Sequence, residues 1–153
     1  MAITKIKRTH NTNKVTINLK QEYKQSNPTA IKPKGLWYGI NDGWSKWCNS
    51  EMPHWIRKKH YTVILKDNIK LLVLNTESDI MEFHKKYVVK KKEIITCIDW
   101  EKVAREYDGI EIRSYDRYNN VLRFDIEMLW YYGWDCSSGC IWNLDKIKVK
   151  EVK

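Results

Sequence analysis

The 153-residue chain contains few of the residues that interrupt regular structure, with only 6 glycines and 3 prolines. Apolar residues make up 42% of it, so the composition is neither that of a disordered chain nor that of a low-complexity one. A chain of this length buries about two thirds of the surface that its unfolded form exposes. We therefore expect residues 1–153 to form a single folded domain.

Long hydrophobic runs are also missing. The opening segment MAITKIKRTH lacks the apolar stretch of about seven residues found in a secretory signal, and no later segment approaches the ~18 apolar residues of a membrane span. These absences predict a cytoplasmic protein without membrane contact. Because the cytoplasm keeps thiols reduced, we expect the cysteines to be free thiols: Cys48, Cys97, Cys136 and Cys140.

The motifs of several common functional classes are absent from the sequence. There is no G-x-S-x-G, no Walker loop and no G-x-G-x-x-G, which disfavours a serine hydrolase of that type and the common nucleotide-binding folds. Cys136 and Cys140 have no second close pair nearby, and His54 and His60 have no partner pair of cysteines. We therefore expect no metal site.

Positive charge is in excess, since 28 Lys and Arg against 19 Asp and Glu give a formal net charge of +9. A surface with this excess attracts polyanions by releasing their condensed counterions. The longest basic runs are IRKKH at 56–60 and HKKYVVKKKE at 84–93. A nucleic-acid partner and an ordinary solvated face are both compatible with these runs.

Alternating apolar residues and turn residues predict strands along much of the chain. Two apolar runs surround Asp67 and Asn68, which indicates a hairpin or a tight strand pair over 61–75. A loop containing two prolines is expected at 25–35, and turns are expected at 119–120, around Gly133 and at 137–139. The other expected strands are 14–19, 35–40, 94–98, 109–115 and most of the chain after 120.

Apolar residues at helical spacing predict three short helices. After the turn residues NDG, one helix places Trp44, Trp47 and Cys48 on a single face, which we expect to be buried. Together with the strands, these helices predict an α+β domain with a mixed or antiparallel sheet. The second helix is expected to begin at a cap on Thr76 or Ser78 and to bury Ile80, Phe83 and Tyr87. The third is expected to begin at a cap on Asp99 and to stop at Gly109. Its buried residues are expected to be Trp100, Val103, Ala104 and Tyr107.

The aromatic residues are unevenly chosen, with 8 Trp and 9 Tyr but only 2 Phe. A core that needs bulk alone can use Phe, whereas Trp and Tyr carry a polar atom that needs a partner when buried. They form one block from Trp37 to Trp55 and another from Trp130 to Trp142, each interrupted by glycine and small polar residues. Core packing accounts for part of each block, and flat rings beside glycine also suit a pocket that stacks a nicotinamide, an adenine or a nucleobase.

Two carboxylates are candidates for catalytic chemistry. In the predicted strand DGIEIRSY, Ile110 and Ile112 would face the core, and Glu111 and Arg113 the opposite side. Glu111 is then either a catalytic group or half of a solvent-facing ion pair. Asp135 interrupts the aromatic segment YGWDCSSGC and is either catalytic or an Asx-type turn residue.

Four segments of the chain resemble the ADP-ribosyltransferase-like superfamily, including its toxin and RES-related branches. KIKRTH, with Arg8, resembles an early strand that carries an Arg or His, and GLWYGINDGWSKWC resembles the second strand and the helix that follows it. In that segment Tyr38 stands at the aromatic position and Gly39 where Ala or Ser is usual. AREYDGIEI and SSGCIWNLDKI resemble a helix-to-strand passage and the last strand pair, but Ser138 and Gly139 stand where an acidic residue is expected.

This resemblance implies an enzyme that uses NAD and cleaves its nicotinamide glycosidic bond. Aromatic faces would hold the nicotinamide and Arg8 would bind the pyrophosphate. Catalysis would fall to Glu111, Ser138 or Asp135, with Glu127 as a further candidate, or would have been lost. The residues implied in binding NAD are Arg8, Gly35, Trp37, Tyr38, Gly39 and Trp134.

The positive charge, added to the resemblance, favours a nucleic acid or a nucleic-acid-associated target as the acceptor of ADP-ribose, as for a toxin or a phage or host-conflict factor. Two other functions fit the same residues. In a non-enzymatic nucleic-acid-binding module the tryptophans would stack on bases and the lysines would follow the phosphates. In a protein-binding inhibitor the aromatic residues would form a hot-spot surface.

Overall fold

The computed structural model describes residues 5–25, 31–89, 97–115 and 128–153, which form an α+β fold. Its main sheet has seven strands in these ranges, in the order β4-β7-β8-β2-β1-β3-β9. The strands are β1 (Arg8–Thr12), β2 (Leu36–Ile40), β3 (Lys59–Leu65), β4 (Leu71–Leu74), β7 (Gly109–Ile112), β8 (Ser138–Ile141) and β9 (Ile147–Glu151), with a separate pair of β5 (Val88–Val89) and β6 (Cys97–Ile98). The helices are α1 (Gly43–Glu51), α2 (Glu77–Tyr87), α3 (Trp100–Glu106) and α5 (Leu129–Tyr132), with short 3-10 turns η1 (Pro53–Trp55) and η3 (Leu144–Lys146).

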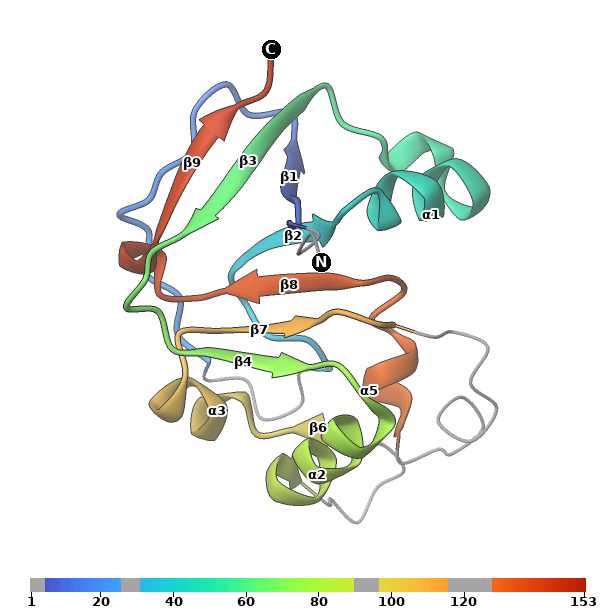
Figure 1. The fold of residues 1–153 in the computed structure, drawn as a ribbon, viewed down its shortest axis with the longest axis vertical. Coiled ribbons are helices and arrows are strands. Elements are labelled where there is room, and N and C mark those ends of the chain that lie inside the picture. Colours follow the sequence, from blue (N-terminus) through green and yellow to red (C-terminus); the bar gives the residue numbers. More distant parts are fainter. Residues whose placement is uncertain (1–4, 26–30, 90–96, 116–127) are drawn as a thin grey trace.

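The main sheet is mixed and strongly curled. β4 and β7 are parallel, and every other described pair in this sheet is antiparallel. In Figure 1, β4, β7 and β8 run across the view, whereas β1, β3 and β9 run along it. The change of direction occurs at β1 and β2, so these two strands join the two halves of the sheet.

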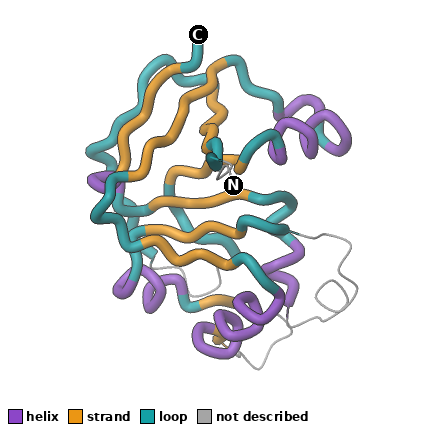
Figure 2. Tube along the Cα trace, viewed as in Figure 1, coloured by secondary structure: helices purple, strands orange, loops and turns teal. Residues whose placement is uncertain are grey.

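The two faces of the sheet carry different apolar clusters, and helices pack on one of them. Helices α2, α3 and α5 gather at the β4 end of the sheet, while α1 projects from the end of β2 (Figures 1 and 2). On the helix-covered face, Ile110 and Ile112 pack against side chains such as Phe83, Trp100 and Trp130. The opposite face carries a second cluster, formed by Leu36, Tyr38, Ile40, Val63, Ile141, Leu144 and Ile147.

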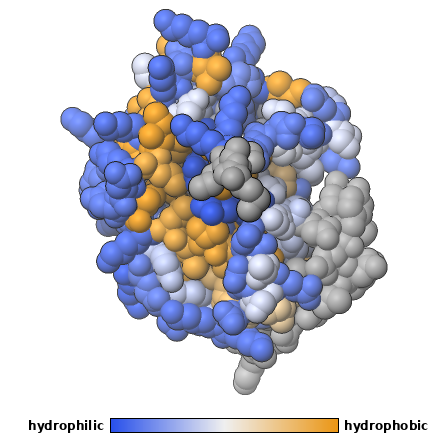
Figure 3. Space-filling model, in the orientation of Figure 1, coloured by the Kyte–Doolittle hydropathy of each residue, from blue (hydrophilic) through white to orange (hydrophobic). Residues whose placement is uncertain are grey.

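The face of the sheet seen in Figure 1 is partly apolar at its surface. Figure 3 shows apolar side chains across the middle of this face and hydrophilic ones around them. The half-buried residues that pack on the second cluster include Leu65, Leu71 and Val149. Residues of the segment before β2, such as Ile17 and Leu19, also pack against this cluster and cover part of it.

The predicted starts of two helices are confirmed. The Thr76 side chain accepts from the Asp79 backbone N–H at 3.1 Å, and the Asp79 carboxylate accepts from the Thr76 N–H at 3.0 Å, which is a capping box. The Asp99 side chain accepts from the Lys102 N–H at 3.0 Å. The predicted end of the third helix is wrong: α3 ends at Glu106, and Gly109 is the first residue of β7.

Strand pairing departs from the predictions in two places. No strand forms at 14–19, and the first strand is instead Arg8–Thr12. The hairpin over 61–75 is also wrong, because β3 pairs with β1 and β9 whereas β4 pairs in parallel with β7. Asp67 and Asn68 do turn the chain, but they send it to the opposite edge of the sheet.

The last third of the chain also differs from its prediction. Leu129–Tyr132 forms the helix α5 where a strand was expected, and β8 begins at Ser138 within the expected turn at 137–139. The turn expected at 119–120 lies outside the described residues. In α1 only Cys48 is buried, so the expectation that Trp44 and Trp47 are core residues is wrong.

Candidate functional site

A pocket opens where β1 separates from β2. The two strands pair only through Arg8 with Ile40 and Thr9 with Gly39, after which β1 continues alone along β3. At the next residue, His10, a side-chain hydrogen bond replaces the backbone pairing with β2, since its Nδ1 lies 2.5 Å from the carbonyl oxygen of Trp37. The gap between the diverging strands is therefore bridged by one side chain and is otherwise open to a ligand.

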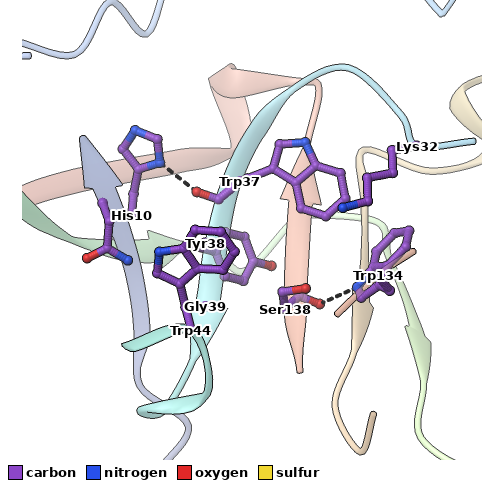
Figure 4. A pocket seen from close by; sticks show the side chains of 9 residues that line it. His10, Lys32, Trp37, Tyr38, Gly39, Trp44, Trp134 and Ser138 are labelled. Carbon is purple, nitrogen blue, oxygen red and sulfur yellow. Dashed lines mark hydrogen bonds between the residues drawn. The ribbon is translucent and has the colours of Figure 1, made fainter. Parts of the chain in front are cut away.

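The pocket has a volume of about 250 Å³ and is mainly aromatic. Figure 4 shows Trp37, Trp44 and Trp134 around it, with Lys32 reaching over Trp37. The rings of Trp37 and Trp134 meet edge to face, with centroids 4.9 Å apart, which fixes two of its walls. Its lining consists of His10, Asn11, Lys32, Trp37, Tyr38, Gly39, Trp44, Trp134 and Ser138.

Gly39 allows the helix α1 to approach the floor of this pocket. A Cβ atom on Gly39 would lie 2.7 Å from the Cβ of Trp44, closer than carbon atoms can pack. The bare backbone at this position therefore lets the first turn of α1 lie against β2 and holds Trp44 at the pocket. Asn41, which connects the two elements, takes a left-handed φ of 55° that Asn tolerates better than most residues.

His10 is a neutral imidazole with a defined tautomer. Burial lowers its pKa, the hydrogen bond to the carbonyl of Trp37 opposes this effect, and the charge of Lys14 adds to it. Because a carbonyl only accepts hydrogen bonds, Nδ1 carries the proton and donates to Trp37. Nε2 then keeps a lone pair that can accept a hydrogen bond or a proton.

Ser138 and Lys32 add polar groups to the pocket. The Ser138 hydroxyl donates to the Cys136 carbonyl at 3.0 Å, so its oxygen can accept from a ligand but is not activated for attack. The Lys32 ammonium lies 5.5 Å from the centre of the Trp37 ring and 3.6 Å from a carboxylate oxygen of Asp135. Asp135 itself takes a left-handed φ of 73°, as expected for a turn residue.

A second, more polar hollow adjoins the aromatic pocket. It has a volume of about 260 Å³ and shares Asn11, Gly39 and Trp44 with the aromatic pocket. Its other lining residues are Lys7, Thr9, Asn41, Asp42, Ser45, His60 and Val152. The two hollows together offer an aromatic end and a polar end to one ligand.

Glu111 lies on the other face of the sheet, in a closed cluster of charges. In the register of β2, β8 and β7, Tyr38, Gly139 and Glu111 are aligned on one face. A Cβ on Gly139 would lie 2.5 Å from the Tyr38 ring, so the glycine lets Tyr38 cross β8 and donate its hydroxyl to Glu111 at 2.7 Å. Arg8 and Arg113 complete the cluster, Arg8 through Nε and through Nη2 at 3.3 Å, and Arg113 through Nε at 2.9 Å.

The Glu111 carboxylate stays ionised although it is fully buried. Burial disfavours the charge, but hydrogen bonds from Arg8, Tyr38 and Arg113 and the charge of Arg8 outweigh it, so its pKa is lowered. The pKa of Tyr38 is raised well above its usual value by burial and by Glu111, which keeps its hydroxyl protonated as a donor. The ion pair expected between Glu111 and Arg113 exists, but its carboxylate is buried and does not face solvent.

The predicted site residues divide into two groups. Five line the aromatic pocket: Trp37, Tyr38, Gly39, Trp134 and Ser138. Four lie elsewhere: Arg8 and Glu111 in the buried cluster, Gly35 packed against Ile141 and Cys140, and Asp135 beside Lys32. Glu127 lies outside the described residues.

Sequence reasoning missed four residues that line the pocket: His10, Asn11, Lys32 and Trp44. Trp44 was assigned to the core because of its helical spacing. Lys32 lies in a loop and Asn11 is one of several polar residues near the start, so no pattern distinguishes them. His10 belongs to KIKRTH, which was expected to resemble a strand, but only Arg8 was singled out in that segment.

Other features of the described residues set limits on the chemistry. No helix among them has the length and apolar character needed to cross a membrane. In the same ranges, no group of three or more His, Cys, Asp or Glu side chains is arranged to hold a metal ion. The four cysteines are buried and lie outside any disulfide. Burial raises the pKa of Cys136 to about 11, so at neutral pH it is not a thiolate nucleophile.

Comparisons of the chain with protein-family models, with curated proteins and with solved structures found no match.

Proposed function

We propose that the chain is an NAD-using, ADP-ribosyltransferase-like protein that binds the nicotinamide end of NAD in the aromatic pocket. The observation that carries this proposal is the pocket between the diverging strands β1 and β2, where aromatic walls, a neutral His10 and the Ser138 oxygen converge. It is supported by the position of the segment GLWYG, whose Trp37, Tyr38 and Gly39 supply part of the lining. The motif that resembles the superfamily thus lies at the pocket.

The size of the two hollows fits NAD in two parts. The aromatic pocket, at about 250 Å³, is smaller than the ~300–1,000 Å³ typical of whole-ligand sites, so it suits one ring with part of its ribose. The adjoining polar hollow can receive the rest of the molecule, with Lys7 near the phosphates. Ser138 would accept a hydrogen bond from the carboxamide of the nicotinamide. Arg8 does not bind the pyrophosphate in this arrangement, because Glu111 holds its guanidinium on the other face.

The proposed reaction breaks the bond between the nicotinamide nitrogen and C1′ of its ribose. The electron pair of that bond stays with nicotinamide, which leaves as a neutral molecule, and the ribose becomes oxocarbenium-like. The acceptor then forms a bond to C1′ and loses a proton, which Nε2 of His10 can take. We assign the stabilising negative charge to Asp135, which does not line the pocket itself but lies 3.6 Å from the ammonium of Lys32, which does. Glu111 is excluded because two arginines hold it on the other face.

The test measures NAD binding and nicotinamide release separately. NAD should quench tryptophan fluorescence, and Trp37→Leu should weaken binding at least about tenfold by removing one stacking wall. Tyr38→Phe is the control, because it removes only a hydroxyl that faces Glu111 and not the pocket. Asp135→Asn should slow nicotinamide release and leave NAD affinity within about twofold.

Two outcomes would change the proposal. If NAD neither quenches fluorescence nor yields nicotinamide, the pocket does not bind NAD. If NAD binds in a Trp37-dependent way but no nicotinamide appears with any acceptor tested, the protein binds NAD without catalysis.

A further inference from the structure

The corner formed by α1 and η1 carries a stack of three tryptophans. Trp44 and Trp47 lie one helical turn apart on α1, with ring centroids 5.2 Å apart and planes inclined by 25°. Trp55, from η1, stacks on Trp44 at 6.2 Å and 26° and meets Trp47 at 5.6 Å. The short 3-10 turn after Pro53 brings Trp55 back against the helix. The result is one aromatic surface built from two elements.

This corner is not an ordinary piece of core. Cys48 is the only buried residue of α1, while Trp44 and Trp47 are half-buried. Trp55 is 37% exposed and Ile56 is 50% exposed. Figure 1 shows α1 projecting away from the sheet and from the other helices. Large apolar side chains that stay in solvent on a projecting element are typical of a binding surface.

Positive charge accompanies the exposed rings. The fifteen residues from Met52 to Lys66 include Arg57, Lys58, Lys59 and Lys66 and no Asp or Glu. Lys59 is held by Glu151 at 3.0 Å, so Arg57 and Lys58 are the remaining cations that follow Trp55 closely in sequence. Arg57 lies close to α1, since its charge lowers the pKa of the Cys48 thiol, although burial raises that pKa overall. Flat aromatic faces can stack on nucleic-acid bases, and neighbouring cations can bind the phosphates that connect those bases.

The same stack leads into the pocket. Trp44 lines both the aromatic pocket and the polar hollow, and its ring also stacks with Trp47 and Trp55. We infer that the α1–η1 corner binds single-stranded nucleic acid, with bases on Trp47 and Trp55 and phosphates near Arg57 and Lys58. That this strand is the acceptor of ADP-ribose rests on the proposed function.

The inference is tested by fluorescence anisotropy with labelled single-stranded RNA and DNA of about 12 nucleotides. Trp55→Ala should weaken binding about tenfold, which is the loss of one stacked base. Arg57→Ala with Lys58→Ala should weaken binding and lower the slope of log affinity against log salt by about 1.4, because each phosphate contact contributes about 0.7 on single strands. The measurement needs no NAD, so it can succeed or fail independently of the proposed function.

A charge-matched control separates this site from general attraction to a basic protein. Lys148→Ala with Lys150→Ala removes the same charge from exposed positions on the edge strand β9 and should leave affinity and salt slope unchanged. If this control loses as much affinity as the Arg57 and Lys58 variant, binding is diffuse and the inference is wrong. It is also wrong if Trp55→Ala binds like the unmodified protein, or if no oligonucleotide binds at low salt, in which case the corner is a packing feature or a protein-binding surface.

The link to the pocket has its own measurement. When the oligonucleotide is added with NAD, Trp55→Ala should reduce its labelling without changing NAD affinity. Labelling that is equal in Trp55→Ala and the unmodified protein would separate the strand-binding corner from the acceptor site.

Discussion

The aromatic pocket and the Glu111 cluster lie on opposite faces of the same part of the sheet, and Tyr38 belongs to both. Tyr38 is among the residues that line the pocket, while its ring crosses β8 on the Glu111 face and donates its hydroxyl to Glu111. In the pocket, polar atoms such as Nε2 of His10 can still accept a hydrogen bond or a proton. In the cluster, one carboxylate receives bonds from Arg8, Tyr38 and Arg113.

This difference shows that residue type alone does not locate a site. Glu111 looks catalytic in sequence because it is a carboxylate on a strand, but its burial and its partners make it a structural charge. The pocket is mainly aromatic and has fewer ionisable groups, yet the hydrogen-bonding atoms of its lining are available to a ligand. A catalytic or binding residue needs suitable chemistry and also a hydrogen-bonding atom that is not already used and that a ligand can reach.

Removing the Glu111 carboxylate should have the largest effect on stability. Glu111→Ala leaves two part-buried guanidiniums and the Tyr38 hydroxyl without their acceptor, and the expected cost is about 3–5 kcal/mol in the free energy of unfolding, measured with urea. Glu111→Gln, which keeps the shape and can still accept, should cost less. If Glu111→Ala changes the free energy by less than about 1 kcal/mol, the cluster is not structural.

A methyl group at Gly139 should have the next largest effect, because it acts on the shared residue Tyr38. In Gly139→Ala the new Cβ would meet the Tyr38 ring at 2.5 Å, so the ring must move and its bond to Glu111 must lengthen. We expect a loss of about 1–3 kcal/mol in the free energy of unfolding. NAD binding should weaken as well, since Tyr38 is also one of the residues that line the pocket.

Gly133→Ala provides the matched control for this change. At Gly133 the nearest atom to a new Cβ is 3.6 Å away and the backbone is right-handed, so alanine should be neutral or slightly stabilising. Equal losses in the two alanine variants would show that the contact with Tyr38 does not matter.

The local elements could be predicted from sequence, whereas their pairing could not. The helix starts at Thr76 and Asp99 depend on neighbouring residues only, and both were predicted correctly. The strand partners depend on contacts between distant segments, so the parallel pairing of β4 with β7 left no local pattern. Leu129–Tyr132 has strand-forming residues, yet it is helical because Trp130 and Tyr131 pack against the core below the sheet.

Only one wall of the candidate site could be predicted from the sequence. The segment from Gly35 to Gly39 identified one wall, because aromatic residues beside glycine indicate a pocket in any fold. The opposite wall requires knowing that β1 leaves β2 after Thr9, which brings His10 and Asn11 to that wall. Glu111 and Arg113 were correctly placed on one face, but the burial of the carboxylate depends on Arg8, more than 100 residues away in sequence.

The smallest effect expected is a difference in pH dependence between the two regions. In the folded protein the pKa of His10 lies below its usual value, so the unfolded chain binds more protons and stability falls as pH drops below about 6.5. His10→Asn keeps an N–H donor for the Trp37 carbonyl and does not titrate, so this part of the loss should disappear in urea unfolding midpoints measured from pH 8 to pH 5. The buried His84, which accepts from Trp130 at 3.1 Å, is present in both proteins and cancels in the comparison. Glu111 contributes in a different range, because its lowered pKa gives stability that is complete above about pH 4.5 and is lost as pH falls further. If His10→Asn loses stability between pH 6.5 and pH 5 as steeply as the unmodified protein, His10 is not the neutral group that the pocket requires.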